Sequence, residues 1–345
     1  MPEQTCAVIL AGGEGKRMKS NHPKVLASVL FKPMLQWVMD AAEGAGVKEL
    51  CVVTGHKHEQ VEAYLQAAQK PGGANLHHVL QAEQRGTGHA VMMAEPFLRA
   101  HNGGNTLVLN GDAPFVSAEV LKTALAAHVG QGNAVTVISA ELDDPSGYGR
   151  IVRDPATGLV RAIVEQKDAD EATLAVREIN SGAYWFRTDD LLSILGCIRN
   201  DNAQGEYYLT DAVRLLIEQN KNAGAYIASD PAAVMGANDC VQLNSLNEIA
   251  RERVLHAQML AGVEIPSTDG VLIGPGVTIG RSTRILPNTI LRGNTAVGAD
   301  CSIGPSVVLT DCTVGDGASL CFASCERTNI SSSQAVAPFT VIGTP

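Results

Sequence analysis

Glycines and basic side chains are concentrated in one stretch near the start of the chain. A short apolar run over residues 7–10, rich in β-branched side chains, opens the stretch and indicates a buried strand. Glycines after a strand let the backbone turn tightly and bring N–H groups close to a ligand. The glycines are Gly12, Gly13 and Gly15, and the cations that follow are Lys16, Arg17, Lys19 and Lys24. In an acidic chain this stretch is a candidate polyphosphate site, and the alternative is a strand, a flexible turn and a solvated basic loop.

Two common phosphate-binding motifs do not fit this stretch. A Walker loop has Ser or Thr after Gly-Lys, whereas Arg17 follows Gly15-Lys16 here. A dinucleotide-binding fingerprint has a third glycine at the start of its helix, but Met18 stands at that point. If the stretch binds phosphate, it therefore does so through another class of loop.

Two further segments carry groups that suit a nucleotide. Asp112 directly follows an apolar run that ends at Asn110-Gly111, and a carboxylate at the end of a buried strand suits Mg²⁺ and its phosphate partners. Its alternative role is a turn cap before Pro114. The segment Gln81–Ala90 combines amides and glycines that could contact a base edge, although alone it would be only a turn.

Alternating strands and helices must position these groups. The predicted strands cover residues 7–10, 50–54, 76–80 and 106–110, and the predicted helices cover 33–42, 59–67 and 88–98. This alternation predicts an α/β, Rossmann-like domain with a mainly parallel sheet, helices on both faces and ligands at the carboxyl ends of the strands. Residues 133–228 are more mixed, with strands near 134–139, 160–165 and 182–186, and we assign them to the same domain.

The last third of the chain has a different pattern. Apolar residues at three- and four-residue steps predict one amphipathic helix over residues 240–261. Apolar residues then recur every six positions, which is typical of a parallel β-helix of hexapeptide repeats. The repeat residues are Ile273, Ile279, Ile285, Leu291, Val297, Ile303 and Leu309. The register shifts at Val314 and becomes irregular toward Pro345, so we expect about four coils. The predicted divisions are 1–239, a linker helix over 240–262, and a short β-helix over 263–345.

Composition narrows the classes of partner and compartment. A formal charge of −10 and a pI near 5.4 argue against a nucleic-acid-binding or acidic-membrane-binding surface. The N-terminus lacks the pattern of a signal peptide, and no apolar run approaches the length of a membrane span. We therefore expect a cytoplasmic protein. The eight cysteines fit no standard zinc spacing and are expected to be free thiols.

The motifs together resemble one family over almost the whole chain. Residues 10–18 and Pro23-Lys24 resemble the signature of sugar-nucleotide pyrophosphorylases, with Gly12 where alanine is commoner and Lys16 where threonine is. The chain as a whole resembles the bacterial bifunctional N-acetylglucosamine-1-phosphate uridylyltransferase/glucosamine-1-phosphate acetyltransferase, and its motifs occur in the same order as in that family. The motifs are LAGGEGKRM, PKVL, QAEQRGTGHA, NGDAP, PSGYGRIVR, IVEQKD, EINSG, NAQGEYYLTD and GANDCVQL, followed by the helix and the hexapeptide repeat.

The resemblance implies a role for each matching residue. The nucleotide would contact Leu10, Ala11, Gly12, Gly13, Lys24, Gln81, Gly86, Thr87, Asn110, Gly111 and Asp112, with Asn110 standing where tyrosine is usual. The amino sugar would contact Gly149, Glu165, Asn180 and Asn238. Mg²⁺ would be held by Asp112 and Asn238, and Arg17, Lys24 and Asp112 would carry catalysis. His89 is interpreted as a structural residue rather than a base.

The implied activity is that of a UDP-N-acetylglucosamine pyrophosphorylase that feeds cell-envelope precursor synthesis. The sugar phosphate would attack the α-phosphorus of UTP in line and release pyrophosphate, with Mg²⁺, Lys24 and Arg17 offsetting the charge. The resemblance also implies a homotrimer formed through a left-handed β-helix. Because the chain stops before the family's acetyl-transfer segment, we expect that activity to be absent. The alternatives are a nucleotidyltransferase for another sugar, such as glucose 1-phosphate with UTP or dTTP, and a non-catalytic regulatory or assembly subunit.

Overall fold

The computed structural model of the protein describes residues 4–343 and separates into two compact units. The first unit comprises the chain up to Ala27 together with Pro33–Cys240, and the second comprises Ser28–Lys32 and the chain from Val241 onward. The outer ends of the first and last predicted domains, residues 1–3 and 344–345, lie outside the described residues. The predicted domain boundaries stay a prediction.

The first unit is built on a nine-stranded sheet with the order β11-β7-β10-β6-β1-β4-β5, while β8 pairs with β10 and β9 pairs with β8. The strands are β1 (Thr5–Leu10), β4 (Glu49–Thr54), β5 (Asn75–Leu80), β6 (Asn105–Asn110), β7 (Val135–Glu141), β8 (Arg150–Arg153), β9 (Val160–Val164), β10 (Glu178–Arg187) and β11 (Ala223–Ile227). β1 runs parallel to β4 and β6, and β4 runs parallel to β5. β11 runs parallel to β7, whereas β10 is antiparallel to β6, β7 and β8, and β8 is antiparallel to β9. The mainly parallel sheet predicted from the alternation is confirmed.

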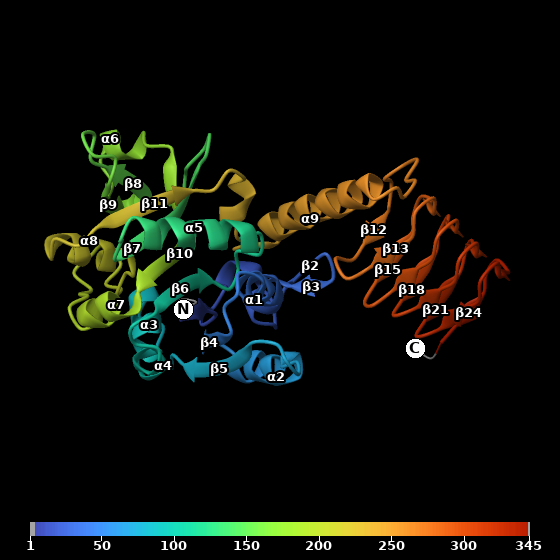
Figure 1. Ribbon diagram of the computed structural model, residues 1–345, viewed down its shortest axis with the longest axis horizontal. Helices are drawn as coiled ribbons and strands as arrows, with labels where there is room; N and C mark the ends of the chain where they lie inside the picture. Colours follow the sequence, from blue (N-terminus) through green and yellow to red (C-terminus); the bar gives the residue numbers. More distant parts are fainter. Residues whose placement is uncertain (1–3, 344–345) are drawn as a thin grey trace. The chain divides into compact units, whose positions relative to one another are not determined.

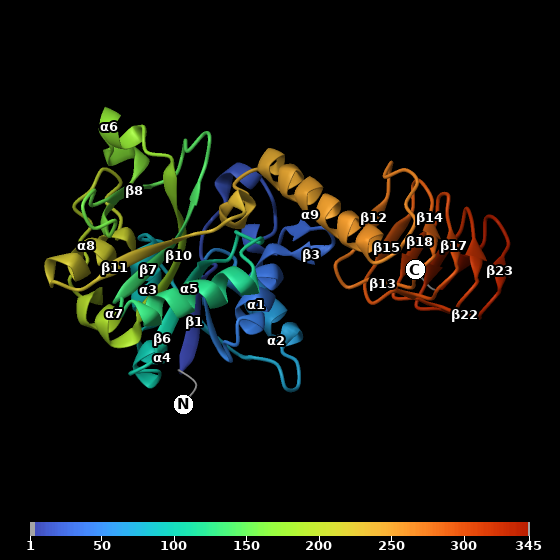
Figure 2. The same cartoon turned by 45° about the horizontal axis from the view of Figure 1, so that its top comes forward.

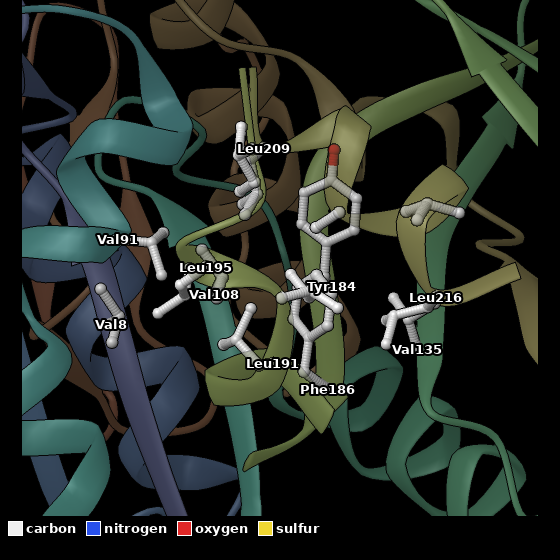
Figure 3. Packing of buried hydrophobic residues seen from close by; sticks show 14 of the residues in the cluster. Val8, Val91, Val108, Val135, Tyr184, Phe186, Leu191, Leu195, Leu209 and Leu216 are labelled. Carbon is white, nitrogen blue, oxygen red and sulfur yellow. The ribbon is translucent and has the colours of Figure 1, made fainter. Parts of the chain in front are cut away.

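Helices cover both faces of this sheet. Alternate residues of β1 point to opposite faces, with Cys6 and Val8 in one buried cluster and Ala7 and Ile9 in the other. The helices that pack on the first cluster are α3 (Thr87–Met93), α4 (Glu95–Ala100), α7 (Thr188–Leu195) and α8 (Thr210–Glu218), and those on the second are α1 (Met34–Gly44), α2 (His58–Ala68) and α5 (Ala118–Gly130). Figure 3 shows the first cluster, in which Val8 and Val108 face Val91 and Leu195. Burial on both faces explains why β1 reads as a continuous apolar run.

Some local elements differ from the prediction. The single helix expected over residues 88–98 is two helices, α3 and α4, which meet at Ala94. Pro96 lies in the first turn of α4, where its missing N–H costs nothing, but it could not continue a helix that began before it. Several elements were not predicted. They are the strands β8 and β11, the helices α5, α7 and α8, and the short elements β2 (Ser28–Val29), β3 (Lys32–Pro33) and α6 (Glu171–Leu174).

The second unit contains the long helix α9 (Cys240–Leu260) and a left-handed β-helix, as predicted. The coils form sheets of five, four and four strands, and Figures 1 and 2 show the coils stacked along one axis. The strands are β12 (Leu272–Ile273), β13 (Thr278–Ile279), β14 (Arg284–Ile285), β15 (Ile290–Arg292), β16 (Ala296–Val297), β17 (Ser302–Ile303), β18 (Val308–Thr310), β19 (Thr313–Val314), β20 (Ser319–Leu320), β21 (Ser324–Glu326), β22 (Asn329–Ile330), β23 (Ala335–Val336) and β24 (Val341–Ile342). The hexapeptide residues point inward, and Ile273, Ile285 and Leu291 are fully buried.

Pairing between coils continues past the point where the sequence repeat becomes irregular. Leu291 pairs with Leu309, eighteen residues on, whereas Leu309 pairs with Cys325, only sixteen residues on. β21 still pairs with β24 near the end of the described chain. The irregular repeat therefore reflects shorter corners between strands rather than a loss of coils. Among the described helices, none is both long and apolar enough to cross a membrane.

Candidate functional site

The carboxyl ends of four parallel strands bring the predicted nucleotide segments together. Leu10 at the end of β1 lies beside Val53 of β4 and Asn110 of β6, and Thr54 lies beside Leu80 of β5. The glycine loop follows β1, Gln81 follows β5 and Asp112 follows β6. The three segments singled out in the sequence therefore meet at one edge of the sheet, as ligand sites of open parallel sheets do.

A cavity of about 360 Å³ opens at this edge. The predicted nucleotide residues that line it are Leu10, Gly12, Gly13, Lys24, Gln81, Gly86, Thr87, Asn110 and Asp112. Ala11 and Gly111 do not line it. Both are buried and tied to neighbouring strands, since the Ala11 N–H donates to Val53 O and the Gly111 N–H donates to Leu10 O.

Arg17 is also outside the cavity lining. It lies in the short 3-10 helix Lys16–Met18 and is exposed. Within the described residues it forms no hydrogen bond or ion pair. An arginine at this position is therefore available to an anionic ligand, but the structure does not place it against the other candidate residues.

Lys24 links the two predicted metal ligands. Its Nζ donates to Asn238 Oδ1 at 3.1 Å and forms an ion pair with Asp112 Oδ2. The stem of Lys24 packs against Gly15, where an added Cβ would lie only 2.9 Å from Lys24 Cβ. Gly15 also has a φ of +62°, so a glycine is required at this point of the loop for two reasons.

The same two oxygens fit a hard divalent cation. Asp112 Oδ2 and Asn238 Oδ1 converge on a single ammonium, and carboxylate and amide oxygens are the ligands that Mg²⁺ takes in proteins. Mg²⁺ usually binds through one or two protein oxygens and completes its shell with phosphate and water. The chemistry and the convergence of this pair therefore suit a metal that is shared with a nucleotide.

Gln81 is a buried amide held in one orientation. Its Nε2 donates to Gly86 O at 3.1 Å, which requires nitrogen rather than oxygen at that position, and the same Nε2 lies 3.0 Å from His89 Nδ1. Its Oε1 then faces Gly12, where an added Cβ would lie 3.0 Å from it. Glycine in place of the commoner alanine thus leaves room for Gln81 Oε1. His89 contacts Gln81, and its interpretation as a structural residue stays a prediction.

Three of the predicted sugar residues form a second group: Gly149 directly precedes β8, Glu165 directly follows β9, and Asn180 lies on β10. The Asn180 N–H donates to Gly149 O at 2.9 Å, and an added Cβ at Gly149 would lie 3.4 Å from Glu165 Oε2. Gly149, Glu165 and Asn180 are therefore neighbours, although they are far apart in sequence. Asn238, the fourth predicted sugar residue, bonds to Lys24.

Glu165 is a partly buried carboxylate with few partners. Burial is the largest influence and raises its pKa, the nearby Asp168 and Asp211 raise it further, and a hydrogen bond from Thr210 Oγ1 at 3.3 Å lowers it. The pKa of Asp211 is itself raised, mainly by burial. This side of the site therefore concentrates negative charge and acceptor oxygens, which suits a ligand rich in hydroxyl groups.

The nucleotide and sugar groups are joined by two segments. Asn110 Nδ2 donates to Ser181 O at 3.4 Å, at the point where the pairing of β10 with β7 shifts register between Asn180 and Ala183. Residues 206–209 run beside the turn that follows Gln81, where the Gly88 N–H donates to Tyr207 O at 2.7 Å and Thr87 Oγ1 accepts from the Leu209 N–H at 3.0 Å.

Four cavity-lining residues were not predicted. They are Val25, Gln84, Ala90 and Glu206. Gln84 and Ala90 belong to the segment Gln81–Ala90, which the sequence already indicates as a candidate contact to a base. Both residues could therefore have been predicted together with Gln81, Gly86 and Thr87. Glu206 lies in NAQGEYYLTD, one of the motifs that carry the resemblance, but the resemblance gave this residue no role.

Comparisons with known proteins agree with this geometry. Residues 6–251 match the nucleotidyl transferase family, and residues 276–311 match the bacterial transferase hexapeptide family. A relative from Caldanaerobacter subterraneus, named bifunctional protein GlmU, is 43% identical over 98% of this chain and 71% of its own length. The chain belongs to the GlmU family of nucleotidyl transferases. The GlmU protein of Streptomyces avermitilis is also 43% identical, over 96% of this chain and 68% of its own length.

A solved structure supports the fold alone. A Bacillus anthracis protein described as a glucose-1-phosphate thymidylyltransferase superposes with a TM-score of 0.60 and 19% identity. The match covers 72% of this chain and 96% of that protein. Family membership makes this chain a sugar-phosphate nucleotidyltransferase. The expected lack of acetyl transfer stays a prediction.

Proposed function

We propose that the protein transfers UMP from UTP to N-acetylglucosamine 1-phosphate and releases pyrophosphate. The observation that supports this most directly is the cluster of Lys24, Asp112 and Asn238. Lys24 and Asp112 line the cavity that also contains the oriented amide of Gln81. A lysine ammonium and two convergent side-chain oxygens beside a cavity of this size suit a nucleoside triphosphate with its metal. The family match supports the same class of reaction.

The reaction needs alignment and charge compensation rather than a protein nucleophile. A sugar phosphate is already an anionic nucleophile, so the enzyme must bring its oxygen in line with the α-phosphorus of UTP. Lys24 would stabilise charge that builds up on the α-phosphate, and Arg17 would bind the outer phosphates. Bound Mg²⁺, held by Asp112 and Asn238, would supply further charge neutralisation for the leaving pyrophosphate.

Gln81 suits the selection of uracil. Its Nε2 is already engaged by Gly86 O and His89 Nδ1, so Oε1 is the atom left to meet a base. That oxygen only accepts hydrogen bonds. Uracil presents an N–H donor at N3, whereas cytosine presents an acceptor there, so the oriented amide would favour UTP over CTP.

The neighbouring group supports a sugar acceptor. Glu165, Asn180 and the Gly149 backbone offer several acceptor oxygens within one part of β8–β10. Such groups would accept hydrogen bonds from sugar hydroxyls and from an N-acetyl N–H. The choice of an N-acetyl sugar over glucose rests on the motifs EINSG and NAQGEYYLTD.

We also propose that the β-helix forms a homotrimer. Phe322 and Phe339 stack with ring centroids 5.7 Å apart and are 45% and 83% exposed, and Val341 is 77% exposed. Exposed apolar side chains of this size commonly mark association surfaces. Light scattering on the full chain would test this proposal, and a monomer at micromolar concentration would contradict it.

A substrate panel tests the reaction. The full chain would be assayed for pyrophosphate release with UTP, CTP and dTTP against N-acetylglucosamine 1-phosphate, glucosamine 1-phosphate and glucose 1-phosphate. We expect UTP with N-acetylglucosamine 1-phosphate to give the highest kcat/KM. A preference for glucose 1-phosphate would favour the alternative sugar nucleotidyltransferase. Release from no pair would favour the regulatory or assembly subunit.

A further inference from the structure

The ammonium of Lys24 lies against both side chains that would hold the cation. It donates to Asn238 Oδ1 at 3.1 Å and pairs with Asp112 Oδ2. The Lys24 and Asp112 side chains are only 14% and 21% exposed. A positive charge therefore already lies against both oxygens.

The rest of Lys24 is held in place, so only the outer part of its side chain can move. Its backbone lies in the short 3-10 helix Lys24–Leu26, which follows Pro23. The close approach of Gly15 to Lys24 Cβ restricts the base of the side chain. A lysine has a flexible four-carbon stem, so Nζ can leave these oxygens while the backbone remains fixed.

We propose that Lys24 occupies the cation position until substrate binds, so that the ammonium and the divalent cation compete for Asp112 and Asn238. Two cations cannot share these oxygens at close range, because their repulsion is only weakly screened at partly buried positions. A nucleotide removes the competition, since its α-phosphate offers Lys24 another anion. The source of that phosphate is the nucleotide of the proposed function, on which this inference rests in part.

The inference predicts a specific coupling between ligands. The metal alone would bind weakly, because it must displace Lys24 from its two partners. Nucleotide and metal would bind cooperatively, and by linkage each would strengthen the other by the same factor. A lysine that only touched the α-phosphate in the transition state would not affect binding of the metal alone.

Manganese binding tests the competition without any reaction. Mn²⁺ alone would be titrated into the wild-type chain, Lys24→Met and Lys19→Met, and free Mn²⁺ would be measured by electron paramagnetic resonance. Lys19 is exposed and lies in the same loop, and its replacement removes one positive charge without changing the Asp112 contacts. We expect Lys24→Met to bind Mn²⁺ at least about tenfold more tightly than wild type, and Lys19→Met to stay within about twofold.

A second substitution tests whether the tighter Mn²⁺ binding of Lys24→Met depends on the Asp112 carboxylate. Adding Asp112→Asn to Lys24→Met should abolish the tighter binding, whereas a gain that persists would overturn the inference. Mn²⁺ binding by Lys24→Met that is no tighter than wild type would also overturn it. If Lys24→Met folds poorly, Lys24→Gln would replace it, and Mn²⁺ should then raise the Tm of that variant by more than the Tm of wild type. An equal rise in both proteins would count against the inference.

The same samples separate this inference from the proposed reaction. Tighter Mn²⁺ binding by Lys24→Met together with no UDP-sugar formation by wild type would retain the competition and reject the reaction. UDP-sugar formation by wild type with unchanged Mn²⁺ binding by the variant would reject only the competition.

Discussion

The nucleotide side and the sugar side of the site are built on the same sheet, but they differ in how their charges are compensated. On the nucleotide side, Lys24 already pairs with Asp112 and Asn238, and the amide nitrogen of Gln81 is already hydrogen-bonded. On the sugar side, Glu165 receives one hydroxyl donor and lies near two further carboxylates, and its pKa is raised. The charged groups of the nucleotide side are therefore paired with one another, whereas the sugar side contains a carboxylate with few hydrogen-bond donors.

This difference assigns different consequences to mutations on the two sides. The charged groups on the nucleotide side act mainly on the transition state, because they lie where charge would develop on the transferring phosphate. A carboxylate short of donors gains partners when a hydroxyl-rich ligand arrives, so it acts mainly on ligand binding. Changes on the nucleotide side should therefore lower kcat, and changes on the sugar side should raise the KM for the sugar phosphate.

The largest effect is expected for Asp112→Asn. The substitution keeps the size of the side chain but removes the charge that would hold the cation, so kcat should fall at least about a hundredfold, or about 3 kcal/mol of barrier. Steady-state kinetics would be measured with circular dichroism as a check on folding. A folded variant with near-normal turnover would show that the paired side does not carry the chemistry.

Lys24→Ala should have the second largest effect. Removing the ammonium should lower kcat by at least about tenfold and change the KM for UTP less, since its charge matters most in the transition state. Lys19→Ala is the matched control, because Lys19 lies in the same loop and is exposed. If Lys24→Ala changed only the KM for UTP, Lys24 would be a binding residue and the contrast between the two sides would weaken.

The sequence predicts the nucleotide side better than the sugar side for a physical reason. Ligand groups at the carboxyl ends of parallel strands follow directly after recognisable apolar runs, as Asp112 and Gln81 do. The regular hexapeptide repeat likewise predicts the β-helix, because every coil obeys the same burial rule. In both cases a local pattern in the sequence determines where a side chain points.

The contacts that join the two sides could not be predicted in this way. Glu206 reaches the nucleotide cavity because the segment after it bonds to residues near Thr87, more than a hundred positions away in the chain. The contact between Asn110 and Ser181 depends on a register shift within β10, which no alternation of apolar residues reveals. Such contacts result from tertiary packing rather than from local periodicity.

Gln81→Leu should have a smaller effect than Asp112→Asn or Lys24→Ala, and it tests base selection on the nucleotide side. Gln81→Leu removes the acceptor oxygen that would face the N3 donor of uracil, so kcat/KM for UTP should fall about tenfold. The preference for UTP over CTP should narrow at the same time, because cytosine loses no partner. Competition assays with both nucleotides would measure the ratio, and an unchanged ratio in a folded variant would place base selection elsewhere in the cavity.

The smallest effect, and the one most specific to the sugar side, is a pH dependence carried by Glu165. Because its pKa is raised above the ordinary value of 4.5, Glu165 takes up a proton at a higher pH than an exposed glutamate would. The KM for the sugar phosphate should therefore begin to rise at a correspondingly higher pH as the solution is acidified, and Glu165→Gln should remove that rise.

Ionisation of the substrate phosphate is shared by both proteins, so it cancels when Glu165→Gln is compared with wild type at each pH. Stability supplies an independent check. A carboxylate whose folded pKa is raised costs stability above that pKa, and the cost disappears below the unfolded value. Glu165→Gln should therefore raise Tm at pH 8, and the gain should shrink as the pH falls toward 4. The contrary result would be parallel pH profiles of KM for the two proteins and equal Tm values at every pH. It would mean that hydrogen-bond donors already balance the charge of Glu165, and that the two sides of the site do not differ in how their charges are compensated.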